Sequence, residues 1–379
     1  MPGPSGAEDL AAWGWTEAWA LAFADHAAAG RRPGRVVGAS PDRVRVRLAG
    51  GEVLATLAGR LRHAAQRAAD HTALPTVGDW VAVEAGAVEG TYADGPADDG
   101  LARIAAVLPR RSAIRRQAGT EQLGQRILAA NVDDLLIVQA VGHDANPRRL
   151  ERYLAMAWSS GARPAVVLNK ADLQPDAGPW SGPLREVALG VPVHVVSAVT
   201  GAGLDGLRDD LGPGRTVALL GSSGVGKSSL VNALLGTQRQ ATAEVRPGDE
   251  RGRHTTVTRE LIAAPEGLLL LDTPGLRSLA PWEAEGGLAA TFADIDELAA
   301  GCRFSDCAHG REPGCAVAAA IAAGTLAAER LASQRKLTRE LAAQTRRNDA
   351  RSRKVERQQW RAIERGLRAR ERSRERGLA

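Results

Sequence analysis

The stretch GSSGVGKS, residues 221–228, constrains the fold of this chain more than any other part of the sequence. It fits the pattern G-x-x-x-x-G-K-[ST], in which glycines let backbone N–H groups wrap around phosphate groups. The apolar segment RTVALL precedes it and the helix-like segment KSSLVNALLG follows it, so the loop joins a strand to a helix. We therefore expect an α/β domain in which Lys227 reaches the β- and γ-phosphates and Ser228 ligates Mg²⁺.

A second stretch, NKAD at residues 169–172, predicts which base is bound. The Asp172 carboxylate can accept two hydrogen bonds, from the N1–H and the exocyclic amine of guanine. Adenine offers neither donor there, so ATP would leave this carboxylate unpaired. Asn169 and Lys170 would support the loop and cover the base. The stretch VSAVTG is typical of a companion guanine loop, with the Ala198 N–H near the base oxygen.

Two further stretches, DTPG and RGRHTTVT, are expected to contact Mg²⁺ and the γ-phosphate. Asp272 ends an apolar run, where it can hold Mg²⁺ through water, and the Gly275 N–H can contact the γ-phosphate. RGRHTTVT, residues 251–258, has no apolar period and is typical of a switch loop. Thr255 and Thr256 are both candidates for a second Mg²⁺ ligand, and we favour Thr256.

Leu276 stands directly after DTPG, where many GTPases carry a glutamine that orients the attacking water. A leucine cannot polarise water, so we expect slow intrinsic hydrolysis that a partner accelerates. His254 is our candidate catalytic residue, brought to the water when the partner orders the switch loop. The alternative is that His254 only contacts RNA or shapes its loop.

The order of these motifs is reversed relative to ordinary GTPases, in which the phosphate loop precedes the base-reading stretch. In an open α/β sheet the ligand lies against loops at the carboxyl ends of strands, whatever the order in which the chain visits them. A domain whose old ends lie close together can be permuted without losing its site. We therefore expect a circularly permuted domain that still binds GTP.

The stretch CRFSDCAHGREPGC predicts a metal centre. Its spacing is C-x4-C-x-H-x5-C, formed by Cys302, Cys307, His309 and Cys315, and it contains all three cysteines of the chain. Three thiolates and one imidazole complete a tetrahedral structural Zn²⁺ shell with no open position. Buried thiols or a redox site are the alternatives.

Short strands separated by Gly, Pro and Asp turns over residues 35–115 predict a small β-barrel, OB-like by its length. In RVRVRL, the alternation places Val44, Val46 and Leu48 toward a core and Arg43, Arg45 and Arg47 toward solvent. These arginines are candidates for contacts with a phosphate backbone, and a merely exposed strand is the alternative. Trp13, Trp15, Trp19 and Leu21 are the apolar residues of a short helical lead-in.

Charge is distributed unevenly along the chain. The formal net charge is +5, but residues 330–379 hold 17 Lys and Arg against 6 Asp and Glu. Such a basic segment favours a polyanionic partner, with a solvated helix as the alternative. The sequence shows neither a signal-peptide pattern nor an apolar run long enough to span a bilayer. We therefore expect a cytoplasmic protein without a membrane partner.

The permuted order NKAD–SA–GSSGVGKSS–GRHTT–DTPG, the arginine-bearing barrel and the C-x4-C-x-H-x5-C spacing resemble the bacterial ribosome small subunit-dependent GTPase A family over about residues 30–325. The resemblance implies an OB-fold, a permuted GTPase domain and an α-rich zinc-binding domain. It also implies a late maturation role on the 30S ribosomal subunit, with hydrolysis stimulated through 16S rRNA contacts. The segment HTTVT departs from the three consecutive threonines common in relatives, and the basic tail is longer than the family suggests.

From these observations we predict a multidomain chain, monomeric, that binds GTP or GDP with Mg²⁺ and one Zn²⁺. The predicted parts are a helical extension (1–30), an OB-fold barrel (31–118), a permuted GTPase domain (119–280), a zinc-binding domain (281–329) and a basic helical or disordered tail (330–379). The predicted nucleotide contacts are Asn169, Lys170, Ala171, Asp172, Ser197, Ala198, Gly221, Ser222, Ser223, Gly224, Val225, Gly226, Lys227, Ser228, Ser229, Thr256, Asp272 and Gly275.

Two other function classes fit parts of the pattern. A non-enzymatic rRNA-binding assembly module would sense GTP without hydrolysing it efficiently, but the intact Lys227, Ser228 and Asp272 argue against it. A P-loop kinase or ATPase would share the phosphate loop, and NKAD argues against that.

Overall fold

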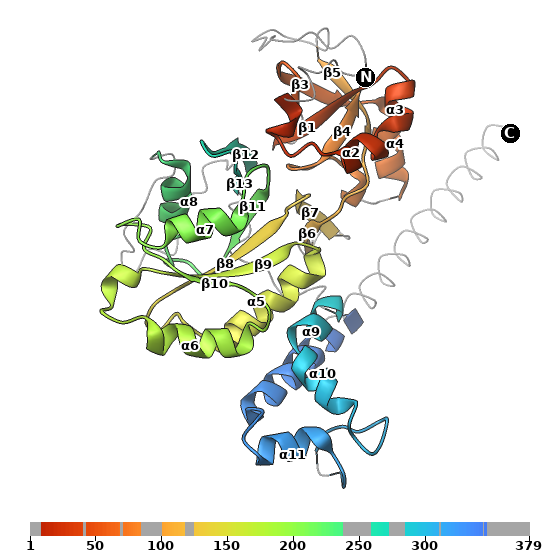
Figure 1. The fold of residues 1–379 in the computed structure, drawn as a ribbon. Coiled ribbons are helices and arrows are strands. Elements are labelled where there is room, and N and C mark those ends of the chain that lie inside the picture. Colours follow the sequence, from red (N-terminus) through yellow and green to blue (C-terminus); the bar gives the residue numbers. More distant parts are fainter. Residues whose placement is uncertain are drawn as a thin grey trace, which may run out of the picture.

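A computed structural model of the chain describes residues 9–40, 43–68, 71–84, 101–117, 125–237, 259–272, 285–310, 312–343 and 345–346. Figure 1 shows its three parts, with a barrel at the top, an α/β sheet in the middle and a group of helices at the bottom. Among the described residues, we find no helix with the length and apolar character needed to cross a membrane.

The barrel is built from five strands, β1 (Arg32–Ala39), β2 (Val44–Leu48), β3 (Gly51–Leu57), β4 (Trp80–Val83) and β5 (Ala102–Val107). They follow the order β1-β2-β3-β5-β4, and pairing between β1 and β4 closes the barrel. β3 and β5 are parallel, and the other pairs are antiparallel. Helix α4 (Gly59–Ala68) and the short 3-10 turn η1 (His71–Ala73) come between β3 and β4 along the chain.

The alternation predicted for β2 is confirmed. Val44, Val46 and Leu48 are buried in the barrel core. The two arginines between them are only partly buried, because successive side chains of a strand point to opposite faces.

The N-terminal segment packs against the barrel through aromatic side chains. It contains the short helices α2 (Glu17–Ala22) and α3 (Ala24–Ala28). Trp19 and Phe23 are buried with Trp80 of β4. The rings of Trp15 and Trp80 are arranged edge to face, with 4.7 Å between their centroids. Leu21 is 79% exposed, so it takes no part in this packing.

The central sheet contains five parallel strands and one antiparallel strand. Its members are β8 (Asp134–Ala140), β9 (Arg163–Asn169), β10 (Val193–Val195), β11 (Thr216–Leu220), β12 (Arg259–Ala263) and β13 (Leu269–Asp272). Their order is β10-β9-β8-β11-β13-β12, with β12 antiparallel to β13. The parallel strands β8, β9 and β11 are buried almost throughout and form near-continuous apolar runs, as expected for an α/β sheet, whereas the edge strand β10 is partly buried.

Helices cover both faces of this sheet. On one face α5 (Pro147–Ser160) and α6 (Gly178–Val187) bury Leu150, Leu154 and Leu184. On the other face α7 (Leu204–Leu211) and α8 (Lys227–Leu235) bury Leu207 and Leu230. The predicted α/β domain is therefore confirmed within the described residues, and its sheet carries helices on both faces.

Local sequence explains where the longest helix of this domain begins and ends. The Asn146 side chain accepts a hydrogen bond from the Arg149 N–H at 3.0 Å, and Pro147 occupies the first helical position of α5. Gly161 ends the helix in the left-handed conformation, with a φ of 80°.

Barrel and central sheet are continuous through strand β12. β12 pairs with β13 on one side and with β1 on the other, where Gly38 faces Glu260 and Ala39 faces Arg259. The described strands other than β6 (Ala113–Gln117) and β7 (Gln125–Ala130) therefore form one eleven-stranded sheet. β6 and β7 pair with each other, so the boundary we predicted at 118–119 falls between paired strands.

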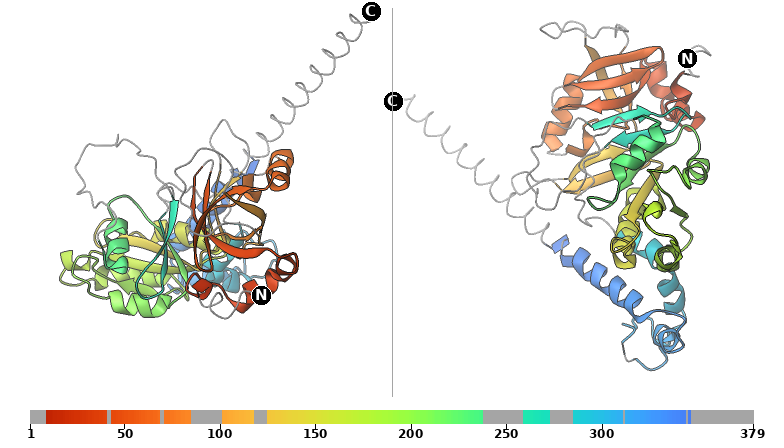
Figure 2. Two further views of the ribbon diagram at one scale, coloured as in Figure 1. Left: turned by 90° about the horizontal axis from the view of Figure 1, so that it is seen from above. Right: turned by 90° about the vertical axis from the view of Figure 1, so that its left-hand side faces the viewer.

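The C-terminal part is helical. It contains α9 (Glu285–Thr291), α10 (Ala293–Ala299), α11 (Ala316–Ala322) and a helix over 328–343. Figure 2, in its right-hand view, places these helices on the side of the central sheet remote from the barrel. Their shared apolar cluster is formed by Phe292, Ile295, Cys315, Val317, Ala320, Leu326, Leu331 and Leu337.

Part of the segment predicted as a basic tail thus belongs to this core. Leu331 and Leu337 are buried in the cluster, and Leu341 packs against Ala155 of α5. The boundary drawn at residue 329 separates residues that pack together. Residues 347–379 lie outside the described part of the chain.

Candidate functional site

The predicted nucleotide loops meet at one edge of the central sheet. Asn169 is the last residue of β9, Gly221 follows β11 directly, and Asp272 is the last residue of β13. β8, β9, β10, β11 and β13 are parallel, so these positions share the carboxyl edge. This is the edge where open α/β sheets bind ligands.

The side chain of Asn169 connects three of these loops. It is 1% exposed, and its Nδ2 donates to the carbonyl oxygen of Val225 in the phosphate loop at 3.0 Å. Its Oδ1 accepts a hydrogen bond from the Ala198 N–H at 3.0 Å. Stretches separated by about fifty residues in the reversed order are therefore in direct contact.

Asp172 is exposed at the mouth of the base-reading loop. Its Oδ1 accepts a hydrogen bond from the hydroxyl of Ser197, with 2.5 Å between the oxygens. The Ser197 Oγ in turn accepts from the Thr200 N–H at 3.1 Å, and the Ala171 N–H donates to the Val196 carbonyl. The carboxylate is thus held by one oxygen, while its acceptor capacity exceeds that single bond.

The phosphate loop follows β11 with backbone contacts that require glycine. A Cβ on Gly221 would lie 2.2 Å from the Val138 carbonyl oxygen, and one on Gly226 would lie 2.4 Å from the Asn169 amide nitrogen. Gly226 also has a φ of 89°, and Gly224 a φ of 83°, in the left-handed region that favours glycine. Val225 is buried, whereas Ser222, Ser223, Ser228 and Ser229 are partly or fully exposed.

Helix α8 begins at Lys227, so its first backbone N–H groups and its positive dipole end face the loop. The Lys227 Nζ donates to the carbonyl oxygens of Gly221, at 2.7 Å, and of Ser222. The ammonium group therefore lies across the loop, where phosphate oxygens bind in proteins with this motif.

Several predicted residues cannot be placed. His254, Thr255, Thr256, Gly275 and Leu276 lie outside the described residues. Asp272 is described as the end of β13, but its side chain is not.

The four residues of the predicted metal centre come together. The ligand atoms of Cys302, Cys307, His309 and Cys315 all lie within 4.8 Å of one another. The Cys302 Sγ is 3.9 Å from the Cys315 Sγ and 3.5 Å from the His309 Nδ1. Thiolates about 2.3 Å from a tetrahedral Zn²⁺ lie about 3.8 Å apart, so the donor set fits this ion.

The thiols of this cluster have unequal acidity. Desolvation opposes ionisation of Cys302, but backbone N–H groups of Val317 and Ala316 and the neighbouring thiols outweigh it and lower the pKa. A backbone hydrogen bond involving His309 favours the Cys307 thiolate, but desolvation and the other thiols raise its pKa to about 11. A bound cation would deprotonate such thiols, because metal binding and proton release are linked.

An ion-pair network fastens the C-terminal helices to the central domain. Arg330 is 5% exposed in its side chain and pairs with Asp294 at 2.5 Å and with Glu151 of α5 at 3.1 Å. It also donates to the Thr291 carbonyl oxygen at 2.8 Å. The arginine thus satisfies charges from both sides of the junction.

Two of the three arginines predicted to face a phosphate backbone are engaged within the chain. Arg45 pairs with Glu260 of β12 at 2.8 Å, and Arg47 pairs with Asp9 at 2.8 Å. Arg43 is exposed. Periodicity predicted their face of the strand correctly, but it carries no information on partners 38 and 215 residues away.

The known proteins that are similar to this chain are GTPases, as its motifs predict. A model of the RsgA GTPase family matches residues 107–282. The protein named small ribosomal subunit biogenesis GTPase RsgA from Opitutus terrae is 46% identical over 364 residues, which cover 96% of this chain and 98% of that protein. This chain belongs to the RsgA family. The RsgA protein of Streptomyces coelicolor is 44% identical over 348 residues, covering 91% of this chain and 90% of its own.

Solved structures share the architecture. The crystal structure of YjeQ from Thermotoga maritima matches with a TM-score of 0.58 and 28% identity, covering 82% of this chain and 99% of that chain. YloQ, described as a circularly permuted GTPase, matches with a TM-score of 0.54 and 22% identity over 83% of this chain and 96% of its own. The permuted order predicted for this RsgA family chain is thereby confirmed as a feature of its fold.

The motifs left some contacts unpredicted. The Ser197 hydroxyl on Asp172 and the Asn169 amide on Val225 join residues of different motifs, and no local pattern signals such pairs. Glu151 and Arg330 likewise carry no signal, since they are 179 residues apart.

Proposed function

We propose that this chain is a GTPase that acts in biogenesis of the small ribosomal subunit. The observation that carries this proposal is the Asn169 side chain, which bonds both to the phosphate loop and to the Ala198 N–H of the companion loop. It supports a single guanine nucleotide site formed from the reversed motifs. The names of the RsgA relatives supply the small-subunit role.

In this proposal Asp172 reads the guanine edge, with Asn169, Lys170, Ala171 and Ser197 holding the loop. The Ala198 N–H, which donates to the Asn169 Oδ1 in this structure, is shared with the base oxygen when guanine binds. Backbone N–H groups of residues 221–229 and the Lys227 ammonium hold the phosphates. Ser228, Asp272 and Thr256 (or Thr255) ligate Mg²⁺ directly or through water, and Gly275 contacts the γ-phosphate. The geometry of the described members supports these assignments.

The Cys₃His cluster would hold one structural Zn²⁺. This supports a folding role, because Cys315 also caps α11 by accepting from the Ala318 N–H and lies in the apolar cluster. Zinc bound there would hold the loop over 302–309 in a fixed position relative to Cys315 at the start of α11.

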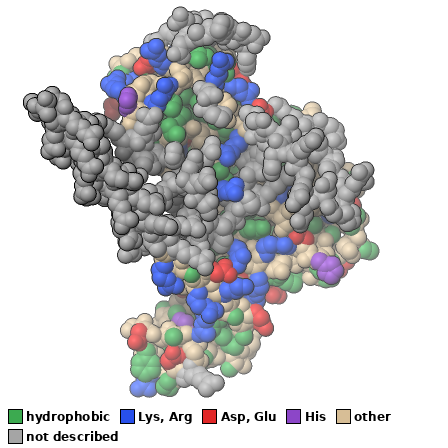
Figure 3. Space-filling view, turned by 180° about the vertical axis from the view of Figure 1, so that it is seen from behind, with side chains coloured by type: hydrophobic (Ala, Val, Ile, Leu, Met, Phe, Trp, Pro, Cys, Tyr) green, Lys and Arg blue, Asp and Glu red, His purple; other side chains and the backbone are tan. Residues whose placement is uncertain are grey.

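We infer that the barrel is an OB-fold. Its closed order, the parallel pairing of β3 with β5 and the helix α4 between β3 and β4 support this assignment. OB-folds bind oligonucleotides, which fits 16S rRNA of the 30S subunit as the partner. Figure 3 shows Lys and Arg side chains over the barrel and over the lower part of the described surface. We also propose a monomeric, cytoplasmic protein.

In this proposal GTP is hydrolysed rapidly only when the small ribosomal subunit is bound. The segment with His254 ends directly before β12, which pairs with barrel strand β1, so RNA bound to the barrel would act on the chain near the switch loop. His254 would then orient the attacking water that Leu276 cannot polarise.

The deciding experiment is hydrolysis of GTP and ATP by the purified chain with and without 30S subunits. We expect slow GTP turnover that rises at least tenfold with subunits, and no stimulated ATP turnover. GTP binding without stimulated turnover would favour the non-enzymatic rRNA-binding module, and equal use of ATP would favour a P-loop ATPase. If His254→Ala leaves stimulated turnover unchanged, His254 is not the catalytic residue.

A further inference from the structure

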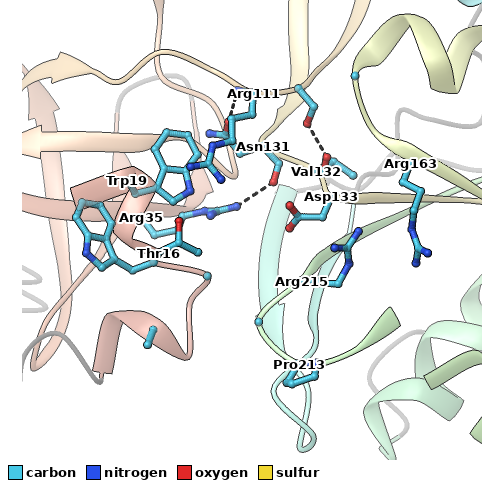
Figure 4. Close-up of a pocket in the computed structure, with 16 residues that line it drawn as sticks. Thr16, Trp19, Arg35, Arg111, Asn131, Val132, Asp133, Arg163, Pro213 and Arg215 are labelled. Carbon is cyan, nitrogen blue, oxygen red and sulfur yellow. Dashed lines mark hydrogen bonds between the residues drawn. The ribbon is translucent and has the colours of Figure 1, made fainter. Parts of the chain in front are cut away.

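A cavity lies at the edge of the central sheet opposite the nucleotide loops, at the amino ends of its parallel strands. Its volume is about 600 Å³, within the range of small-molecule sites. Its walls come from the N-terminal segment, the barrel and the central sheet (Figure 4). β9 runs seven residues from Arg163, at this cavity, to Asn169 at the nucleotide loops. At about 3.3 Å per residue, the two sites are about 20 Å apart.

One wall of the cavity is aromatic. Trp15 and Trp19 line it, and the Trp15 ring is half-buried. The guanidinium carbon of Arg111 lies 4.3 Å from the centroid of the Trp19 ring, and no described carboxylate forms an ion pair with Arg111. Figure 4 shows this stacked pair on the side of the cavity formed by the N-terminal segment. Aromatic and guanidinium planes of this kind are the surfaces on which nucleic-acid bases stack.

Two arginines line the opposite wall. Arg163 and Arg215 share the buried Asp134, at 2.6 and 2.5 Å, and Arg163 also pairs with Asp210 at 3.1 Å. The side chains of both arginines are 38% exposed. Two guanidinium groups therefore face two carboxylates and keep N–H donors beyond these bonds.

Arg35 adds a further positive charge beneath the cavity floor. It is 2% exposed and donates to the Asn131 carbonyl oxygen at 3.2 Å and to the Thr216 hydroxyl at 3.0 Å. Its Nε has no hydrogen-bond partner among the described residues. Desolvation lowers its pKa to about 10, so it stays charged at neutral pH. With Arg111, the lining is cationic overall.

One acceptor completes the site. Asp133 is exposed in the cavity, and its Oδ2 accepts from the Thr216 N–H at 2.7 Å. Figure 4 shows its carboxylate directed toward the side that carries Arg35. A simple inorganic anion would gain nothing from the tryptophans and would be repelled by this carboxylate. A ligand that uses all three groups has a planar ring, N–H donors and an anionic group.

We propose that this cavity binds a nucleoside monophosphate unit, either free or as one residue of a single-stranded RNA. The base stacks on Trp15 with its amino group toward Asp133, and the phosphate lies at Arg111 and Arg215. Stacking contributes about 1–3 kcal/mol per base, and guanidinium groups bind phosphate with two parallel hydrogen bonds. This site is separate from the proposed GTPase centre and does not depend on hydrolysis.

The test uses the full chain saturated with GDP and Mg²⁺, so that the guanine site is filled. Binding of AMP, CMP, inorganic phosphate and a four-nucleotide RNA is measured by saturation-transfer NMR and calorimetry. We expect saturable binding of one AMP or CMP per chain, at least tenfold tighter than inorganic phosphate. Tighter binding of the RNA identifies an RNA residue as the occupant, and binding of AMP alone identifies a free nucleotide.

Variants locate the binding. Thr16 lines the cavity, is exposed and makes no side-chain cap bond, so Thr16→Trp fills the space without removing a helix cap. We expect this variant to abolish AMP binding and Arg111→Ala to weaken it at least tenfold, while GDP binding is retained. Arg62→Ala, on the barrel surface, is the matched control. The proposal is overturned if wild type binds none of the nucleotide probes, or if Arg111→Ala and Thr16→Trp bind them as wild type does. Should Thr16→Trp fail to fold, Arg111→Ala decides alone.

Discussion

Asn169 holds three loops together through one side-chain amide, and Asp172 beside it is held by a single serine hydroxyl. Both residues were predicted from the same tetrapeptide, yet the structure gives them different tasks. Asn169 is buried and its amide bonds to two neighbouring loops, whereas Asp172 is exposed. At this scale the chemistry of a motif is predictable, but the partner of each atom is not.

Asp172→Asn tests base recognition. The substitution replaces an acceptor-only carboxylate by an amide whose NH₂ opposes the guanine donors. Charge-assisted hydrogen bonds contribute about 1.5–3 kcal/mol, so we expect GTP affinity to fall about 10- to 100-fold while ATP affinity stays as weak as before. Calorimetry with both nucleotides measures the change. Asp176→Asn, in the exposed turn before α6, serves as control, and equal effects of the two variants would contradict the assignment of Asp172.

Asn169→Ala tests the connection between the loops. It removes the bonds to the buried Val225 carbonyl and to the Ala198 N–H of a partly buried residue, and leaves both backbone groups without this partner. We expect a loss of about 2 kcal/mol in the free energy of unfolding and at least tenfold weaker GDP binding. Denaturant unfolding and fluorescence titration measure the two effects. Weaker GDP binding without loss of stability would mean that the amide contacts the base rather than the loops.

Elements were predicted with mixed success. Parallel strands were predictable because long Val/Leu runs between polar turns have few other structures available, and the permuted GTPase fold is confirmed. β12 escaped prediction, because it begins directly after the switch segment and is antiparallel among parallel strands. The Cys₃His cluster was predictable from spacing alone, because three cysteines and one histidine within fourteen residues have few roles other than binding a metal ion.

Zinc removal tests the C-terminal helices. We expect one Zn²⁺ per purified chain by atomic absorption, lost on chelation or in Cys315→Ser. Without the ion, the cluster around Phe292 loses the link between the segments that carry the ligands, so protease should cut within 285–343 while 125–237 stays protected. Phe304→Ala, which changes an exposed side chain and no ligand, should keep the metal. Unchanged proteolysis after complete zinc loss would contradict a structural role.

The whole molecule is organised around the central sheet, with the barrel joined to one side and the C-terminal helices packed beneath α5. The domain boundaries predicted from composition are approximate. They were placed where the density of charged residues changes, whereas the packed domains end where the buried leucines end. The basic segment shows the difference, since Leu331, Leu337 and Leu341 lie among its charges and are all buried.

Two truncations separate charge from packing. Removal of 347–379 takes away none of the leucines that the structure describes as buried, so we expect the melting temperature to change by about 2 °C or less, together with a weaker salt dependence of 30S binding. Removal of 330–379 deletes Leu331, Leu337 and Leu341 and the Arg330 network, each buried leucine contributing about 2–5 kcal/mol. The C-terminal helices should then fail to fold by calorimetry. Identical melting of the two truncations would show that 330–346 adds nothing to the core.

Strand β12 has a consequence for cutting the molecule apart. It pairs with β13 on one side and with β1 on the other. The barrel therefore covers a strand edge of the central sheet, and the central sheet covers a strand edge of the barrel. A fragment without the barrel would expose β12 as an edge strand, and exposed edge strands pair with strands of other copies. Fragments cut between barrel and central sheet should therefore self-associate, whereas the intact chain carries its own protection against that outcome.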